Sequence, residues 1–74
     1  MPRTLRELKG DLRQAGFSER PGKGSHTVWH HPLVPGRVVL SESDGDDAKR
    51  YQERMARDAL EQLRRAREER HDGQ

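Results

Sequence analysis

The segment TLRELKGDLRQAGF, residues 4–17, determines the first element of the fold. Thr4 and Glu7 form the T-x-x-E pattern of a capping box, in which each residue satisfies a free N–H group at the start of a helix. Apolar residues then recur at helical spacing, at Leu5, Leu8, Leu12 and Ala15. Gly16 is typical of a helix C-terminal cap, and Phe17 should fold back onto the helix. We expect a helix over about residues 4–15.

Three short β-favouring segments follow this helix, at about residues 17–20, 26–31 and 37–40. The turn Pro-Gly-Lys-Gly, residues 21–24, separates the first two. His31-Pro32 and Pro35-Gly36 bracket a hairpin loop between the second and third. Sequential strands joined by short turns predict a three-stranded antiparallel sheet.

A second helix is expected over about residues 47–69, with Asp46 and Asp47 capping its start. Its predicted apolar stripe comprises Ala48, Tyr51, Met55, Ala59 and Leu63, with Ala56 and Leu60 alongside. Residues from about 70 to 74 should fray. The predicted fold is therefore α+β, in the order α-β-β-β-α, with two helices on one face of the sheet. A single domain should span residues 1–74.

The composition limits the core and the class of protein. Only 28% of the residues are hydrophobic and 38% are charged, so the core must be thin. Its larger candidates are Leu5, Leu8, Leu12, Phe17, Val28, Trp29, Val38, Leu40, Tyr51, Met55, Leu60 and Leu63. The lack of cysteine excludes disulfides and thiolate metal sites. With no membrane-length apolar run and no secretion signal, a cytoplasmic protein is expected.

Charge is unevenly distributed along the chain. Residues 1–41 contain seven Lys/Arg and three Asp/Glu, a balance of +4, whereas residues 42–74 contain eight and ten, a balance of −2. The basic part could bind a polyanion. The alternative is that these charges only solubilise the surface.

Gly24-Ser25-His26 is the segment that best fits a catalytic or binding role. Imidazole titrates near neutral pH, so His26 can both take and give a proton. The adjacent glycine lets a ligand approach the backbone, and Lys23 brings positive charge to the same place. This combination suits a phosphodiester substrate, although Gly-Lys-Gly-Ser is also an ordinary flexible loop.

These elements together resemble the HicA toxins of bacterial toxin–antitoxin systems. The resemblance covers about residues 5–41 and depends on the Leu8/Leu12 helix, Gly16-Phe17, Gly24-Ser25-His26 and His31-Pro32. It implies a fold like a double-stranded-RNA-binding domain and an mRNA-cleaving ribonuclease activity. It also implies that His26 is the catalytic residue and that a HicB-type antitoxin binds and blocks the protein.

In such a reaction the RNA 2′-hydroxyl is itself the nucleophile, so the enzyme need only transfer protons and stabilise charge on phosphorus. Lys23, or the backbone and hydroxyl of the Gly24-Ser25 step, could stabilise charge on phosphorus. Arg20 and Arg37 could hold flanking phosphates. Trp29 is expected in the core, although an outward Trp29 could stack on a base.

His26, Val28 and His30 should share one face of their strand, and the sequence leaves open which face the helices cover. His30 is either a second acid/base group or a boundary histidine. Asp44, Asp46 and Asp47 with a histidine could hold a hard cation, but helix capping explains them better, and no metal or cofactor is predicted. A second hypothesis is a non-catalytic RNA- or protein-binding module, favoured by the acidic run at residues 42–47 where other HicA toxins often have a second histidine.

Overall fold

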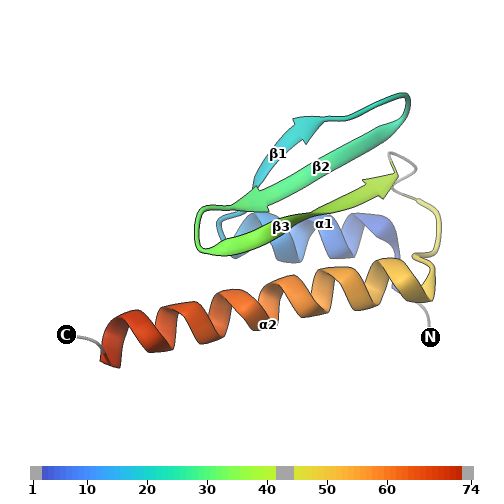
Figure 1. The fold of residues 1–74 in the computed structure, drawn as a ribbon. Coiled ribbons are helices and arrows are strands. Elements are labelled where there is room, and N and C mark those ends of the chain that lie inside the picture. Colours follow the sequence, from blue (N-terminus) through green and yellow to red (C-terminus); the bar gives the residue numbers. More distant parts are fainter. Residues whose placement is uncertain (1–2, 42–44, 73–74) are drawn as a thin grey trace.

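The computed structural model describes residues 3–41 and 45–72, and its elements follow the predicted order. They are helix α1 (Leu5–Gln14), strands β1 (Ser18–Pro21), β2 (His26–His31) and β3 (Val34–Ser41), and helix α2 (Arg50–Asp72). The strands form one antiparallel sheet in the order β1-β2-β3, and both helices lie on the same side of it (Figure 1). The α+β class and the α-β-β-β-α order are therefore confirmed. Positions 42–44 of the predicted acidic loop and 73–74 of the predicted tail lie outside the described residues.

The capping box at the start of α1 is present as predicted. The Glu7 N–H donates to the Thr4 hydroxyl at 3.3 Å, and the Thr4 N–H donates to the Glu7 carboxylate at 3.0 Å. Two N–H groups that helix geometry leaves free are thus satisfied. The Thr4 backbone bond, with smaller contributions from the Thr4 hydroxyl and Arg3, holds the pKa of Glu7 below its usual value.

The C-terminus of α1 is a Schellman motif. The Gly16 N–H donates to the Arg13 carbonyl at 3.1 Å, and the Phe17 N–H donates to the Leu12 carbonyl at 3.0 Å. Gly16 has a φ of +96°, which an L side chain rarely adopts. Phe17 is buried in the core, so the residue after the cap folds back onto the helix as predicted.

Burial decides which face of β2 the helices cover. Thr27 and Trp29 are buried, whereas His26 is exposed and Val28 and His30 are half-buried. Successive strand residues point to opposite faces, so Thr27 and Trp29 face the helices and the other three face away from them. We call this second, helix-free side of the sheet the open face. Of the two candidates for the core in this strand, Trp29 occupies the covered side and Val28 lies on the open face.

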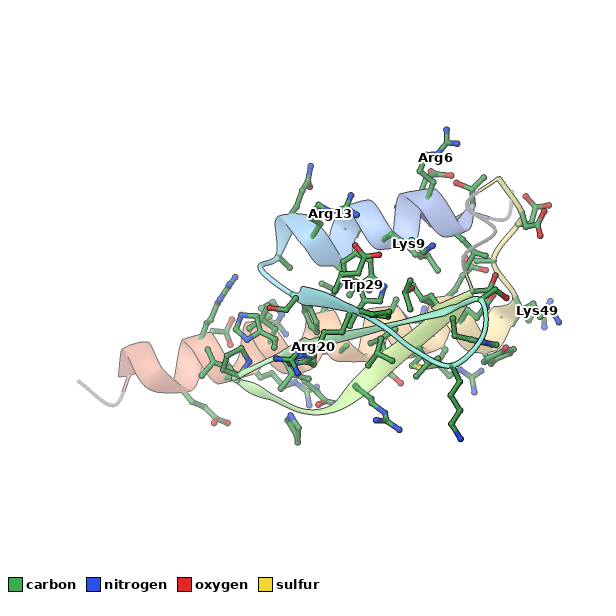
Figure 2. The ribbon with its side chains drawn as sticks, turned by 90° about the horizontal axis from the view of Figure 1, so that it is seen from above. Arg6, Lys9, Arg13, Arg20, Trp29 and Lys49 are labelled. Carbon is green, nitrogen blue, oxygen red and sulfur yellow. The ribbon has the colours of Figure 1, made fainter. Side chains whose placement is uncertain are left out.

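Trp29 is the largest fully buried side chain among the described residues. Figure 2 shows it between α1 and the strands, and the Arg13 guanidinium lies 5.4 Å from its ring centroid. Its indole N–H donates to the Thr27 hydroxyl at 3.1 Å, and that hydroxyl donates to the Leu40 carbonyl of β3 at 3.2 Å. The buried indole N–H and the buried Thr27 hydroxyl thus both have hydrogen-bond partners. The prediction that Trp29 lies in the core is confirmed.

The turn between β2 and β3 is shorter than predicted. β3 begins at Val34, so Pro35 and Gly36 lie inside the strand rather than in a loop. The register shifts between Trp29 and His31, which marks a bulge. An edge strand such as β3 tolerates a proline without an N–H, and Gly36 adopts the φ of +81° that the bulge requires.

At the N-terminus of α2, the predicted aspartate caps and the predicted burial of Tyr51 are both wrong. The helix begins at Arg50, and the Gln52 side chain, rather than an aspartate, accepts the preceding Lys49 N–H at 2.7 Å. Gln52 is buried and Tyr51 is 59% exposed, although the sequence pattern assigned Tyr51 to the apolar stripe. Adjacent helix residues differ by about 100° in direction, so turning Gln52 inward turns Tyr51 outward. The rest of the stripe packs as predicted, at Ala48, Met55, Ala56, Ala59, Leu60 and Leu63.

Long-range hydrogen bonds join α2 to both ends of α1. Before α2, the Ala48 N–H donates to the Arg3 carbonyl at 2.7 Å. Near the other end of α2, Arg67 donates to the Ala15 carbonyl at 3.0 Å across 52 positions of sequence. These two bonds fix the helices relative to each other on the covered side of the sheet.

Gly16→Ala should destabilise the fold by about 1–2 kcal/mol, because a Cβ at positive φ crowds the neighbouring carbonyl. The nearest atom to that Cβ would be His31 Nε2 at 3.5 Å, an ordinary contact distance, so the cost comes from the backbone. The control is Gly10→Ala inside α1, where the Cβ meets nothing within 4 Å. Helix propensity should make that variant more stable by about 0.5–1 kcal/mol. Urea unfolding measures both, and equal stabilities would contradict the role assigned to Gly16.

The stability contributed by the capping box should depend on pH. Because folding lowers the pKa of Glu7, its contribution is present above the unfolded pKa and is lost as the pH falls through the folded value. Glu7→Gln removes the charge, so its deficit relative to the native sequence should shrink between neutral pH and about pH 3. Thermal melts of both proteins across this range measure the difference. A deficit that stays constant with pH would show that the Glu7 charge is irrelevant.

Candidate nucleic-acid interface

The open face of the sheet brings together most of the predicted site residues. Strand pairing places Arg20 of β1 and Val39 of β3 on either side of Val28 in β2. Two shallow hollows adjoin one another on this face. The His26 hollow is lined by Pro21, Gly22, Lys23, His26, Val28, Arg37 and Val39. The His30 hollow is lined by Arg20, Pro21, Val28, His30, Gly36 and Arg37.

The two hollows contain cationic and titratable side chains without a balancing acid. Lys23 and Arg37 line the first, Arg20 and Arg37 line the second, and no carboxylate is among the described residues that line either one. Glu19 of β1 pairs with Trp29, so it points to the covered side, where it lies 3.5 Å from Arg13. The open face is therefore suited to a polyanion.

Backbone hydrogen bonds close the turn before His26. The Gly22 N–H donates to the His26 carbonyl at 2.9 Å, and the His26 N–H donates to the Lys23 carbonyl at 3.2 Å. A Cβ at Gly22 would lie 3.2 Å from both the His26 carbonyl oxygen and a Val28 methyl, so a side chain there would press on β2. Gly24 adopts a φ of +61°, and a Cβ there would meet open space. The two glycines thus do different things: Gly22 permits close packing, and Gly24 permits the turn.

The turn also orients the His26 ring. Its Nδ1 lies 3.2 Å from the Lys23 carbonyl oxygen. A carbonyl can only accept, so Nδ1 is the donor in this contact, and in the neutral ring the lone pair lies on Nε2. The His26 side chain is exposed, so Nε2 is accessible to a substrate. The main chain thus sets the orientation of this exposed ring.

The structure therefore brings four predicted residues to the open face: Arg20, Lys23, His26 and Arg37. Gly24 and Ser25 are exposed in the turn itself and do not line either hollow. The sequence did not predict that Val28 and Val39 line the His26 hollow between the cations. Period-two alternation groups the residues of a strand into faces, but it does not say which face is covered.

The other two strand histidines have separate surroundings. His30 lies four residues along β2 from His26, or about 13 Å at the usual rise per residue. The His31 ring packs on Phe17 with centroids 5.4 Å apart, and its Nδ1 accepts the Leu33 N–H at 3.0 Å. His31 is thus explained by packing at the β2–β3 turn, whereas the hollow around His30 has no such structural explanation.

The alternative cation site lacks a ligand set among the described residues. No three His, Cys, Asp or Glu side chains converge in residues 3–41 and 45–72. The Asp46 carbonyl accepts the Leu5 N–H at 3.0 Å, and Asp47 forms a bridge with Thr4. Asp44, the third predicted ligand, lies outside the described residues. Within the same residues, no helix is long and apolar enough to cross a membrane.

Comparison with known proteins supports the resemblance seen in the sequence. A family model described as the HicA toxin of bacterial toxin–antitoxin systems matches residues 5–64. The match spans α1, the whole sheet and α2 as far as Arg64. No curated protein and no solved structure matches the chain. Because the family model covers most of its length, the chain belongs to the HicA toxin family of bacterial toxin–antitoxin systems.

Proposed function

We propose that this protein is a metal-independent endoribonuclease that cleaves mRNA, with His26 as its catalytic residue. One observation carries the proposal in a chain of this family. An exposed imidazole, oriented by the Lys23 carbonyl, stands in a cationic hollow whose described lining has no carboxylate. The proposed unit is a single domain spanning residues 1–74, acting in the cytoplasm.

In the proposed reaction, His26 Nε2 takes the proton of a ribose 2′-hydroxyl. The 2′-oxygen attacks the adjacent phosphorus, and the bond from phosphorus to the 5′-oxygen breaks. The leaving 5′-oxygen takes a proton from water, which reaches this exposed hollow. The products are a 2′,3′-cyclic phosphate and a free 5′-hydroxyl. A positioned general base of this kind contributes on the order of 10²–10⁴ in rate.

The other residues of the hollow act on the charge of the phosphate. Lys23 and Arg37 enter it from the β1–β2 turn and from β3, and both are positioned to stabilise charge that develops on phosphoryl oxygens. Gly24 and Ser25 offer main-chain and hydroxyl groups at the rim, where no side chain blocks Gly24. Arg20 does not line this hollow, and it adds positive charge to the neighbouring His30 hollow on the same face.

A HicB-type antitoxin is the proposed protein partner. The open face is shallow, so a protein that lies across it would exclude RNA from both hollows at once. The core is also small, and its larger fully buried side chains are Trp29, Leu12, Leu40, Leu63 and Val38. A small core leaves limited stability, which a partner specific for the native state increases by mass action.

A non-catalytic RNA- or protein-binding module remains the second candidate. Among the side chains that the structure describes, His26 is the only histidine that lines its hollow, and this observation favours the second candidate. Such a module would bind RNA on the open face without cleaving it.

His26→Ala should reduce RNA cleavage by about 10²–10⁴ while leaving the melting temperature and RNA affinity nearly unchanged. Cleavage of a defined mRNA and appearance of the cyclic-phosphate end measure the effect. A substrate with a 2′-deoxy sugar at the scissile position should resist the native protein, and chelator should not slow it. Activity that survives in His26→Ala, or that chelator abolishes, would reject this mechanism. If the purified native protein binds RNA but never cleaves it, the binding module is the better account.

Binding of the cognate antitoxin should raise the melting temperature. A ligand specific for the native state adds about 2.7 kcal/mol to stability at a hundredfold excess over its dissociation constant. The measurement is a thermal melt with and without the protein encoded by the adjacent gene. An unrelated acidic protein at equal concentration controls for non-specific charge effects. No shift at saturating partner would contradict the antitoxin assignment.

A further inference from the structure

His30 does not line the hollow in which His26 is proposed to act as general base. A proton donor or acceptor must come within about 2.6–3.2 Å of its oxygen, and the attacking and leaving oxygens share one phosphorus. His26 and His30 are separated by four strand residues, about 13 Å, on the same face. His30 and His26 line separate hollows, so the His30 hollow needs an explanation of its own.

Each strand of the sheet contributes a donor to this hollow. Arg20 comes from β1, His30 from β2 and Arg37 from β3. Among the described residues, neither guanidinium group has a hydrogen bond or an ion pair, and no carboxylate lines the hollow. The arginines near the end of α2 provide a contrast, because Arg64 is bonded to Glu61 and Glu68. The unpaired guanidinium groups of the open face are thus available to an external anion.

The bulge in β3 precedes Arg37, a residue that lines both hollows. Gly36 is in the left-handed region at φ +81°, and the register of β3 is shifted at this point. Bulges of this kind redirect the adjacent side chain. Arg37 follows the bulge and lines both hollows, as do Pro21 and Val28. The two hollows therefore share the apolar side chains of Pro21 and Val28 and the cationic side chain of Arg37.

We infer that Arg20, His30 and Arg37 form a subsite for a second phosphate of the same RNA strand, apart from the phosphate that is cleaved. The inference rests on the proposed ribonuclease function and extends it. The strand lies along β2, with the scissile phosphate at His26 and a ribose over Val28. The non-scissile phosphate then receives hydrogen bonds from the guanidinium groups. The preferred substrate is consequently an oligoribonucleotide that extends beyond the scissile step, rather than a dinucleotide.

The test compares two substrates with three variants. A dinucleoside monophosphate has only the scissile phosphate, whereas a longer oligoribonucleotide also has flanking phosphates. Arg20→Gln and His30→Gln should each raise KM for the oligoribonucleotide, on the order of tenfold for a charge-assisted bond, with kcat little changed. Neither change should affect cleavage of the dinucleoside. Arg54→Gln removes the same charge from an exposed position of α2 and serves as the matched control, with no effect on either substrate.

A binding measurement separates this inference from the catalytic proposal. In a His26→Ala background, fluorescence anisotropy with a 2′-deoxy-blocked oligoribonucleotide should show weaker binding when Arg20→Gln is added. The slope of log affinity against log salt should also fall by about one. If the native protein cleaves no RNA but this loss appears, the subsite stands and the nuclease assignment fails. Equal effects on both substrates, or no effect of Arg20→Gln and His30→Gln on either, would overturn the subsite.

Discussion

The orientation of β2 depends on the burial of one side chain, Trp29. Its ring is fully buried beneath α1, and its N–H is satisfied through Thr27, which is in turn bonded to the Leu40 carbonyl. Because the side-chain period of a strand is two, this arrangement directs His26, Val28 and His30 to the open face together. A slip of one residue would bury two histidines and expose the tryptophan. The residues that stabilise the core therefore also set the position of the candidate site.

Main-chain groups do much of the positioning at that site. The Lys23 carbonyl fixes the tautomer of the His26 ring, and the Gly22 N–H holds the other side of the turn. Both groups belong to a segment of the hairpin that has no side chain at Gly22 or Gly24. Orienting the imidazole with a carboxylate would instead place a negative charge beside His26, which would repel the proposed RNA substrate.

The predictable parts of the fold were those governed by local chemistry. The Thr4 and Glu7 capping box, the Gly16 stop and the order of the elements each depend on residues close in sequence. The covered face of β2 and the exposed position of Tyr51 depended instead on competition between neighbours for the core. Trp29 took the covered side over Val28, and Gln52 turned inward to accept the Lys49 N–H. The sequence predicts a loop at Pro35-Gly36, where the structure has a bulge within β3, because proline and glycine are also typical of loops.

The sheet has two free edges, and each contains a proline. β1 is only four residues long and ends at Pro21, while β3 contains Pro35 next to the bulge. A proline offers no N–H to an incoming strand, and a bulge twists the edge away from flat pairing. Copies of the chain are consequently poor templates for one another at either edge. A small core leaves limited stability, and prolines at both edges disfavour the pairing of strands between copies when the domain opens.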